Sequence, residues 1–158
     1  TTTYPLNNNL DDVIIKVCAL NDFYSTNIFS PFAIAKHIVS LKIDSYLAKD
    51  DLKIVDKIAE IKMNGGKIIH FYSFATKYCS HHKPLVYPIY DSYVDKLLVH
   101  FRNKDKFSNF SNTDLRTYPL YKNILMDFRK FYDLESFNLK QIDQYLWQAG
   151  KEYFPKKY

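Results

Sequence analysis

The chain has 158 residues, of which 47% are hydrophobic and 25% are charged, and only three are glycine. These values are typical of a globular protein and exclude a disordered, collagen-like or disulfide-scaffold chain. The length fits one domain with a substantial core, so we predict a single domain over residues 1–158. The formal net charge is modest, at +5.

The two cysteines, Cys18 and Cys79, have no metal-ligand spacing and suggest no disulfide framework. No apolar run approaches the length of a membrane span, and the first residues lack the basic and apolar regions of a signal peptide. The sequence therefore predicts a cytoplasmic protein with no membrane contact and no bound metal.

The charge is distributed unevenly along the chain. Residues 1–60 hold six lysines and eight acidic residues, whereas residues 61–158 hold sixteen basic and nine acidic residues. Between Ile61 and Lys83 there are four lysines and three histidines but no acidic residue. Such a stretch suits a polyanion such as DNA, although a solvated basic face is an equally good explanation of charge alone.

Amphipathic periodicity and capping signals predict a succession of helices. Asn9, Asp91 and Asn138 are expected N-caps, and Pro84 and Pro88 make residues 84–90 an extended segment. Residues 103–117 are polar and rich in turn formers, which predicts a mobile loop, and residues 118–154 hold the C-terminal helices. No segment alternates clearly enough to predict a strand, so the expected fold class is all-α, a single-domain helical bundle. The predicted helices span residues 10–20, 30–41, 51–63, 67–82, 92–102 and 119–132, and a last helix follows its cap Asn138.

The glycine-containing turn at residues 64–66 lies between two of the predicted helices. Helix, tight turn and helix form the layout of a helix-hairpin-helix, in which backbone amides at the turn and at the start of the second helix bind a DNA phosphate. A plain αα-hairpin has the same layout and is the structural alternative. The residues expected to bind DNA are Lys62, Asn64, Gly65, Gly66, His70 and Lys77.

The motif that follows the turn is more specific. The run Ser73-Phe-Ala-Thr-Lys-Tyr-Cys79, then His82, Pro84 and Tyr87-Pro-Ile-Tyr-Asp-Ser-Tyr-Val94, resembles the helix-hairpin-helix DNA glycosylase superfamily. It is most similar to bacterial proteins with the 8-oxoguanine DNA glycosylase fold, and residues 142–151 resemble their closing helix. The chain departs from that pattern in its Asn-Gly-Gly-Lys turn and in having no cysteine cluster for an iron–sulfur centre.

This resemblance implies a monomeric, cofactor-free enzyme that binds double-stranded DNA and excises an oxidised or otherwise modified base. Asp91 stands at the position of the family's catalytic aspartate, within a region of residues 51–102 that contains the hairpin. Without the resemblance, a simple helix cap is the better explanation of Asp91. The closing helix borders the base pocket in such enzymes and places Asp143 and Trp147 there, with core packing as the alternative for Trp147.

Bifunctional glycosylases of this family add a lysine nucleophile and lyase activity, and two lysines compete for that role. A helix over residues 67–82 would be about 23 Å long, and an extended segment from Lys83 to Asp91 spans up to about 27 Å. A straight return along the helix would bring the Asp91 carboxylate within roughly 10 Å of the Lys67 amine, so Lys67 is preferred and Lys77 is the alternative. An inactive DNA-binding module and a helical protein–protein interaction domain are the competing functions.

Overall fold

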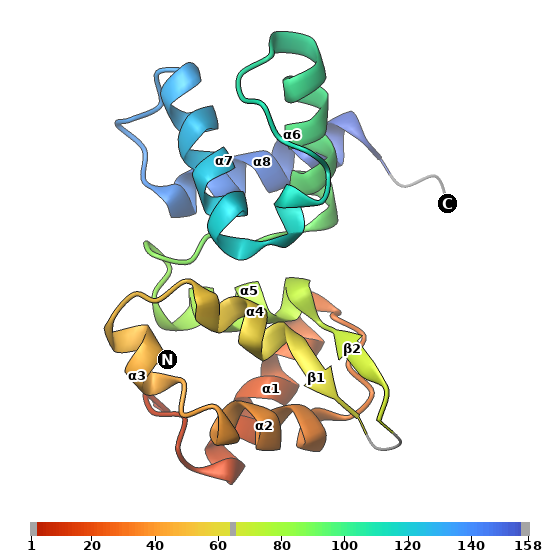
Figure 1. Cartoon of the computed structure of the whole chain (residues 1–158), viewed down its shortest axis with the longest axis vertical. Helices are drawn as coiled ribbons and strands as arrows, with labels where there is room; N and C mark the ends of the chain where they lie inside the picture. The colour runs from red at the N-terminus through yellow and green to blue at the C-terminus, as the bar shows by residue number, and fades with distance from the viewer. Residues whose placement is uncertain (1–2, 64–65, 156–158) are drawn as a thin grey trace. The chain divides into compact units, whose positions relative to one another are not determined.

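The computed structural model describes residues 3–63 and 66–155. The backbone contacts divide the chain into two compact units, Thr1–Lys83 and Pro84–Tyr158, which we call unit 1 and unit 2. The sequence alone predicts a single domain over residues 1–158 and does not indicate this division. Helices dominate both units, so the mostly helical fold class is confirmed (Figure 1).

Unit 1 is built from five helices and two short strands. Asn9 caps the first helix as predicted, because its side chain accepts hydrogen bonds from the amides of Asp11 and Asp12. Helix α1 packs against α2 and α5, and α5 packs against α4, which buries the apolar faces of all four helices. The elements are α1 (Leu10–Tyr24), α2 (Pro31–Ser40), α3 (Asp44–Ala48), α4 (Lys53–Ala59), β1 (Glu60–Lys62), β2 (Ile68–His70) and α5 (Tyr72–His82).

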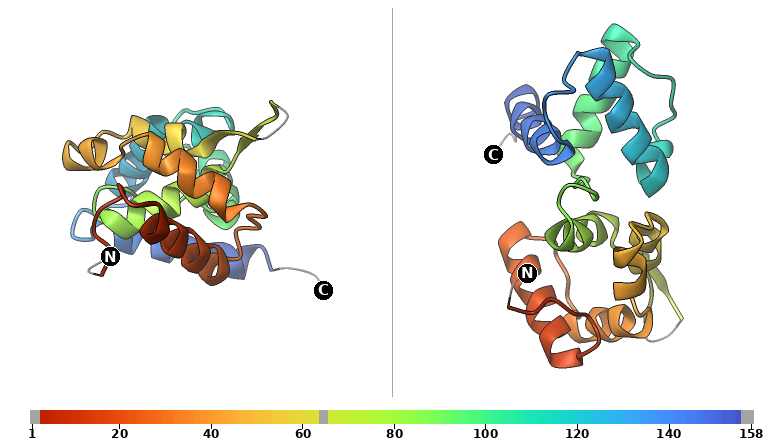
Figure 2. Two further views of the ribbon diagram at one scale, coloured as in Figure 1. Left: turned by 90° about the horizontal axis from the view of Figure 1, so that it is seen from below. Right: turned by 90° about the vertical axis from the view of Figure 1, so that its left-hand side faces the viewer.

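The glycine-containing turn joins two strands and not two helices. Strands β1 and β2 pair antiparallel, with Glu60 opposite His70 and Lys62 opposite Ile68, and they extend away from the helices of unit 1 (Figure 2). The expectation of no strand is therefore wrong, and the helices expected over 51–63 and 67–82 are shorter, spanning Lys53–Ala59 and Tyr72–His82. The β-branched residues around the turn prefer a pleated surface, where Ile61 is buried between two exposed neighbours.

Unit 2 contains three long helices and one short 3-10 segment: α6 (Ser92–Asp105), η1 (Asp114–Arg116), α7 (Tyr118–Phe131) and α8 (Leu139–Tyr153). The predicted N-cap Asn138 at the start of α8 is confirmed, and it forms a capping box in which Asn138 and Gln141 each bond the other's backbone amide. The segment 103–117 was expected to be a mobile loop. It instead buries Phe107, Phe110 and Leu115.

A buried polar network fastens the N-terminal segment to unit 1. The Lys16 amine donates to Asn7 Oδ1 at 2.6 Å and to the Leu6 carbonyl at 2.7 Å, and the Tyr78 hydroxyl donates to the same Asn7 oxygen at 2.6 Å. The side-chain amide nitrogen of Asn7 in turn donates to Asp44 Oδ1 at 2.6 Å. Burial lowers the pKa of Lys16. This network connects α1, α3 and α5 through one asparagine.

His82 packs on the Tyr78 ring in the same region and should make the free energy of unfolding depend on pH. Burial, followed by the positive charge of Lys16, lowers the pKa of His82 to about 4. An unfolded histidine titrates near pH 6.5, so the unfolded state takes up the proton first and the folded state loses stability as the pH falls from about 6.5 towards 4. Urea unfolding should show a loss of about 2 kcal/mol between pH 7.5 and pH 5 from this group.

The variant His82→Gln should flatten that pH dependence, whereas His81→Gln, which alters an exposed neighbour, should leave it in place. An unchanged slope in His82→Gln would mean that His82 is not shielded from water.

Candidate functional site

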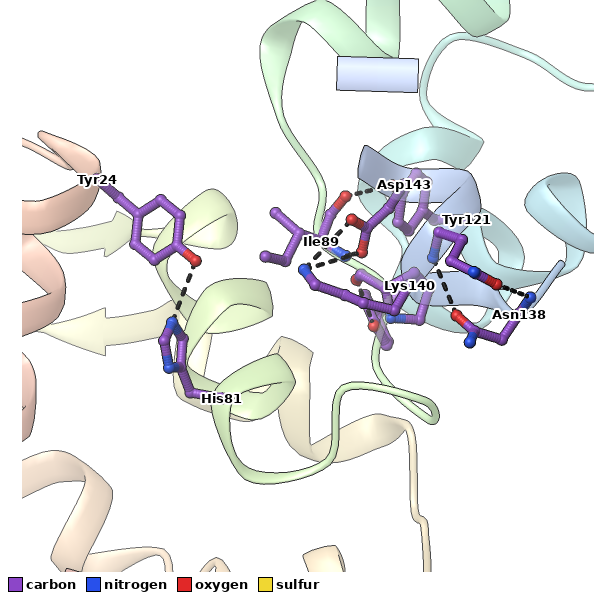
Figure 3. Close-up of polar contacts among 10 residues, drawn as sticks. Tyr24, His81, Ile89, Tyr121, Asn138, Lys140 and Asp143 are labelled. Carbon is purple, nitrogen blue, oxygen red and sulfur yellow. Dashed lines mark hydrogen bonds and ion pairs between the residues drawn. The ribbon is translucent and has the colours of Figure 1, made fainter. Parts of the chain in front are cut away.

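Lys77 lies in the middle of α5 with only 5% of its surface exposed. Its amine donates to Ser73 Oγ at 2.6 Å, one turn earlier on the same helix, and lies 5.3 Å from the centroid of the Tyr24 ring. The Tyr24 hydroxyl in turn shares a hydrogen bond of 3.1 Å with His81 Nε2 (Figure 3). A lysine amine withdrawn from water in this way is the kind that enzymes use as a nucleophile.

Lys67 is exposed and lies between the turn and β2, where its carbonyl accepts a hydrogen bond from the Met63 amide. The following helix begins only at Tyr72 and is about 16 Å long. The premise that favoured Lys67, a continuous helix from Lys67 to His82, is therefore wrong. Lys67 belongs to unit 1 and Asp91 to unit 2, and the expected distance between them stays a prediction.

Asp91 is the N-cap of α6, as predicted: its Oδ1 accepts a hydrogen bond from the Tyr93 amide at 2.9 Å. The segment before it was expected to be extended over residues 84–90, but it forms a turn over residues 84–86 and has no regular structure over residues 88–90. Both backbone polar groups of Ile89 in this segment are held by side chains. The Ile89 amide donates to Asp143 Oδ2 at 3.0 Å, and the Tyr121 hydroxyl donates to the Ile89 carbonyl at 2.6 Å (Figure 3). Asp91 therefore follows a segment whose backbone is fixed by two helices.

The two side chains expected in a base pocket have different surroundings. Asp143 is 4% exposed, bonds the Ile89 amide and lies 3.3 Å from the Lys140 amine. Burial raises the pKa of Asp143, while the Ile89 amide and Lys140 act in the opposite direction. Trp147 exposes 41% of its surface, with the Lys151 amine 3.9 Å from its ring, so the alternative of a core anchor is wrong.

The residues expected to bind DNA divide into two groups. Lys62 and His70 are exposed on one face of the β1–β2 hairpin, together with Glu60 and Ile68, and Lys67 lies beside them. Gly66 has a φ of 83°, the left-handed conformation that favours glycine. Lys77 is buried and separate from this face, and Asn64 and Gly65 lie outside the described residues.

Unit 2 also contains a largely apolar cavity of about 710 Å³ that sequence reasoning missed. It lies where α6, α7, the 132–138 connection and α8 meet. The i, i+4 pair Phe128 and Tyr132 was the available signal, because it places two rings on one side of α7. The lining residues are Phe101, Phe128, Tyr132, Leu134, Phe137, Gln141, Ile142, Gln144 and Tyr145.

Among residues 3–63 and 66–155, no helix combines the length and the apolar character that crossing a membrane requires. The same residues contain no cluster of three histidine, cysteine or acidic side chains arranged to hold a metal ion.

Comparison with known proteins places the chain in one family. A family model for the HI_0787_N group, described as an N-terminal domain, matches residues 1–86, a range that ends three residues after unit 1. A Haemophilus influenzae protein, described as an uncharacterized protein, is 47% identical over 148 residues, which cover 93% of this chain and 70% of that protein. No solved structure matches the chain.

Proposed function

This chain belongs to the HI_0787_N family, and we propose that it is a DNA N-glycosylase-like protein that excises an oxidised or otherwise modified base from double-stranded DNA. The observation that carries the proposal is the buried amine of Lys77, held by Ser73 and the Tyr24 ring within the motif that resembles the 8-oxoguanine glycosylase fold. Lys77 replaces Lys67 as the preferred nucleophile.

In the proposed reaction the Lys77 amine attacks C1′ of the flipped nucleotide. The bond from C1′ to the base breaks, the base leaves with the electron pair and takes up a proton, and the lysine nitrogen loses one. Opening of the sugar ring then gives a Schiff base. The resemblance assigns to the Asp91 carboxylate, in unit 2, the role of stabilising the positive charge that develops on the sugar as the bond breaks.

Duplex binding is proposed to involve the β1–β2 hairpin, which takes the place of the helix-hairpin-helix turn. Lys62, Lys67 and His70 are exposed there, and Gly66 supplies the left-handed turn residue. Amines and backbone amides at such a turn contact phosphates without reading sequence.

The enzymatic proposal is tested by base release. Purified protein is incubated with duplexes that each hold one oxidised, alkylated or deaminated base, 8-oxoguanine among them. The variant Asp91→Asn isolates the chemistry, because asparagine is as good an N-cap as aspartate and should leave α6 intact. Loss of the carboxylate should lower the rate of base release by about two orders of magnitude or more.

An inactive DNA-binding module is the second candidate, favoured by the fact that the Asp91 carboxylate already serves as a helix cap. Salt-dependent duplex binding with no base release from any duplex would support this candidate and contradict the glycosylase proposal.

The hairpin makes a separate prediction about affinity. Lys62→Gln combined with Lys67→Gln should weaken duplex binding and reduce the slope of log Kd against log salt by about two, one for each lost phosphate contact. Fluorescence anisotropy at several salt concentrations measures both. Lys49→Gln with Lys53→Gln changes two exposed lysines away from the hairpin and serves as the matched control. Equal slopes in the two double variants would remove the hairpin from the DNA interface.

A further inference from the structure

We propose that Asp143 and Tyr121 form a clamp on the backbone of Ile89 and that Asp143 is a positioning residue for Asp91. This inference rests on the proposed function and deepens it. Asp143 would hold the Asp91 carboxylate in position through the Ile89 backbone, without touching DNA. The clamp is defined as the Asp143 carboxylate, the Tyr121 hydroxyl and the backbone of Ile89.

The clamp holds both polar groups of one residue from two different helices. Asp143 on α8 accepts from the Ile89 amide at 3.0 Å, and Tyr121 on α7 donates to the Ile89 carbonyl at 2.6 Å. Tyr118, also on α7, donates to the neighbouring Pro88 carbonyl at 2.7 Å. Buried backbone polar groups need hydrogen-bond partners, and these three contacts supply them to the segment that precedes α6.

Ile89 lies two residues before Asp91. Tyr90, between them, donates through its hydroxyl to Asp95 Oδ2 at 2.6 Å on the first turn of α6, and its ring meets the edge of Tyr121 at 5.6 Å. Asp91 itself caps Tyr93. The path of the chain from Ile89 to Tyr93 is therefore fixed at successive residues, which leaves the Asp91 side chain little freedom.

A carboxylate suits this role better than a neutral acceptor. Hydrogen bonds to a charged acceptor are shorter and stronger, but a buried charge needs compensation. Lys140, one turn earlier on α8 and partly exposed, lies 3.3 Å from Asp143 Oδ1 and provides that compensation (Figure 3). Lys140 therefore lies beside Oδ1 of Asp143, while Oδ2 of Asp143 accepts the hydrogen bond from the Ile89 amide.

The test measures amide hydrogen exchange and single-turnover base release on the full chain. Asp143→Ala should speed exchange of the Ile89 and Tyr93 amides by about tenfold or more, because the acceptor is lost and the cap loosens. It should also slow base release about tenfold, with Kd for duplex unchanged within about twofold. Asp143→Asn keeps an acceptor oxygen and should recover most of both effects.

Tyr121→Phe loses only the donor to the Ile89 carbonyl and provides a second variant if Asp143→Ala does not fold. Gln144→Ala, at an exposed position on the same helix, is the matched control and should match the wild type. Unchanged Ile89 exchange in the folded variants would overturn the clamp, and unchanged base release despite faster exchange would overturn its positioning role. If the wild-type protein releases no base, the proposed function fails, and protection of the Tyr93 amide then decides alone whether the clamp positions Asp91.

Discussion

Lys77→Gln is expected to abolish the covalent adduct that borohydride traps between the protein and a lesion duplex. Only an amine can form the Schiff base that borohydride reduces, and glutamine has none. The amide of glutamine can still donate towards Ser73, so the substitution removes the nucleophile while keeping a polar group beside Ser73 and the Tyr24 ring. On a denaturing gel, the band of the covalent protein–DNA adduct should be absent for Lys77→Gln.

Lys67→Gln is the matched control for this experiment. Its exposed position on the hairpin predicts weaker DNA binding but full trapping at saturating duplex. The reverse pattern, with trapping lost in Lys67→Gln and retained in Lys77→Gln, would contradict the assignment and restore the turn lysine as the nucleophile. Circular dichroism of both variants confirms that they are folded.

Gly150→Ala is expected to destabilise unit 2. A Cβ at this position on α8 would lie 2.8 Å from the Tyr93 carbonyl oxygen and 2.9 Å from the Tyr93 Cβ on α6. These contacts involve backbone, so the two helices must separate. Overpacking of this kind costs about 1–3 kcal/mol and exceeds the gain of roughly 1 kcal/mol that alanine brings to a helix. The net result should be a lower Tm by several degrees in calorimetry.

Gln148→Ala, on an exposed part of the same helix, should change the unfolding free energy by no more than about 0.5 kcal/mol. A Tm for Gly150→Ala equal to or above the wild type would show that α6 and α8 do not approach as closely as the Tyr93 contacts require.

Features of the fold that depend on local chemistry were predictable from sequence. Asn9, Asp91 and Asn138 cap helices because their side chains reach backbone amides two or three residues later, which needs no tertiary contact. The β1–β2 hairpin was not predicted because its apolar residues also satisfy a helical period. Ile61 fits both patterns, and only its burial between two exposed neighbours shows which one applies.

In the candidate site, too, only the features that depend on local sequence were predictable. Asp91 was found through the motif and its capping role, but the choice of Lys67 depended on a helix start that the hairpin moves to Tyr72. The contact of Asp143 with Ile89 joins residues 54 apart, and that of Tyr78 with Asn7 joins residues 71 apart. No periodicity or spacing encodes such pairs, because they depend on how whole helices pack.

The most direct measurement is peptide mass spectrometry of the borohydride-reduced adduct formed by the wild-type protein on a lesion duplex. We expect the sugar remnant to be attached to Lys77, within the Tyr72–His82 helix. A remnant on Lys67 would contradict the nucleophile assignment, and the absence of both an adduct and base release from every duplex tested would contradict the glycosylase proposal itself.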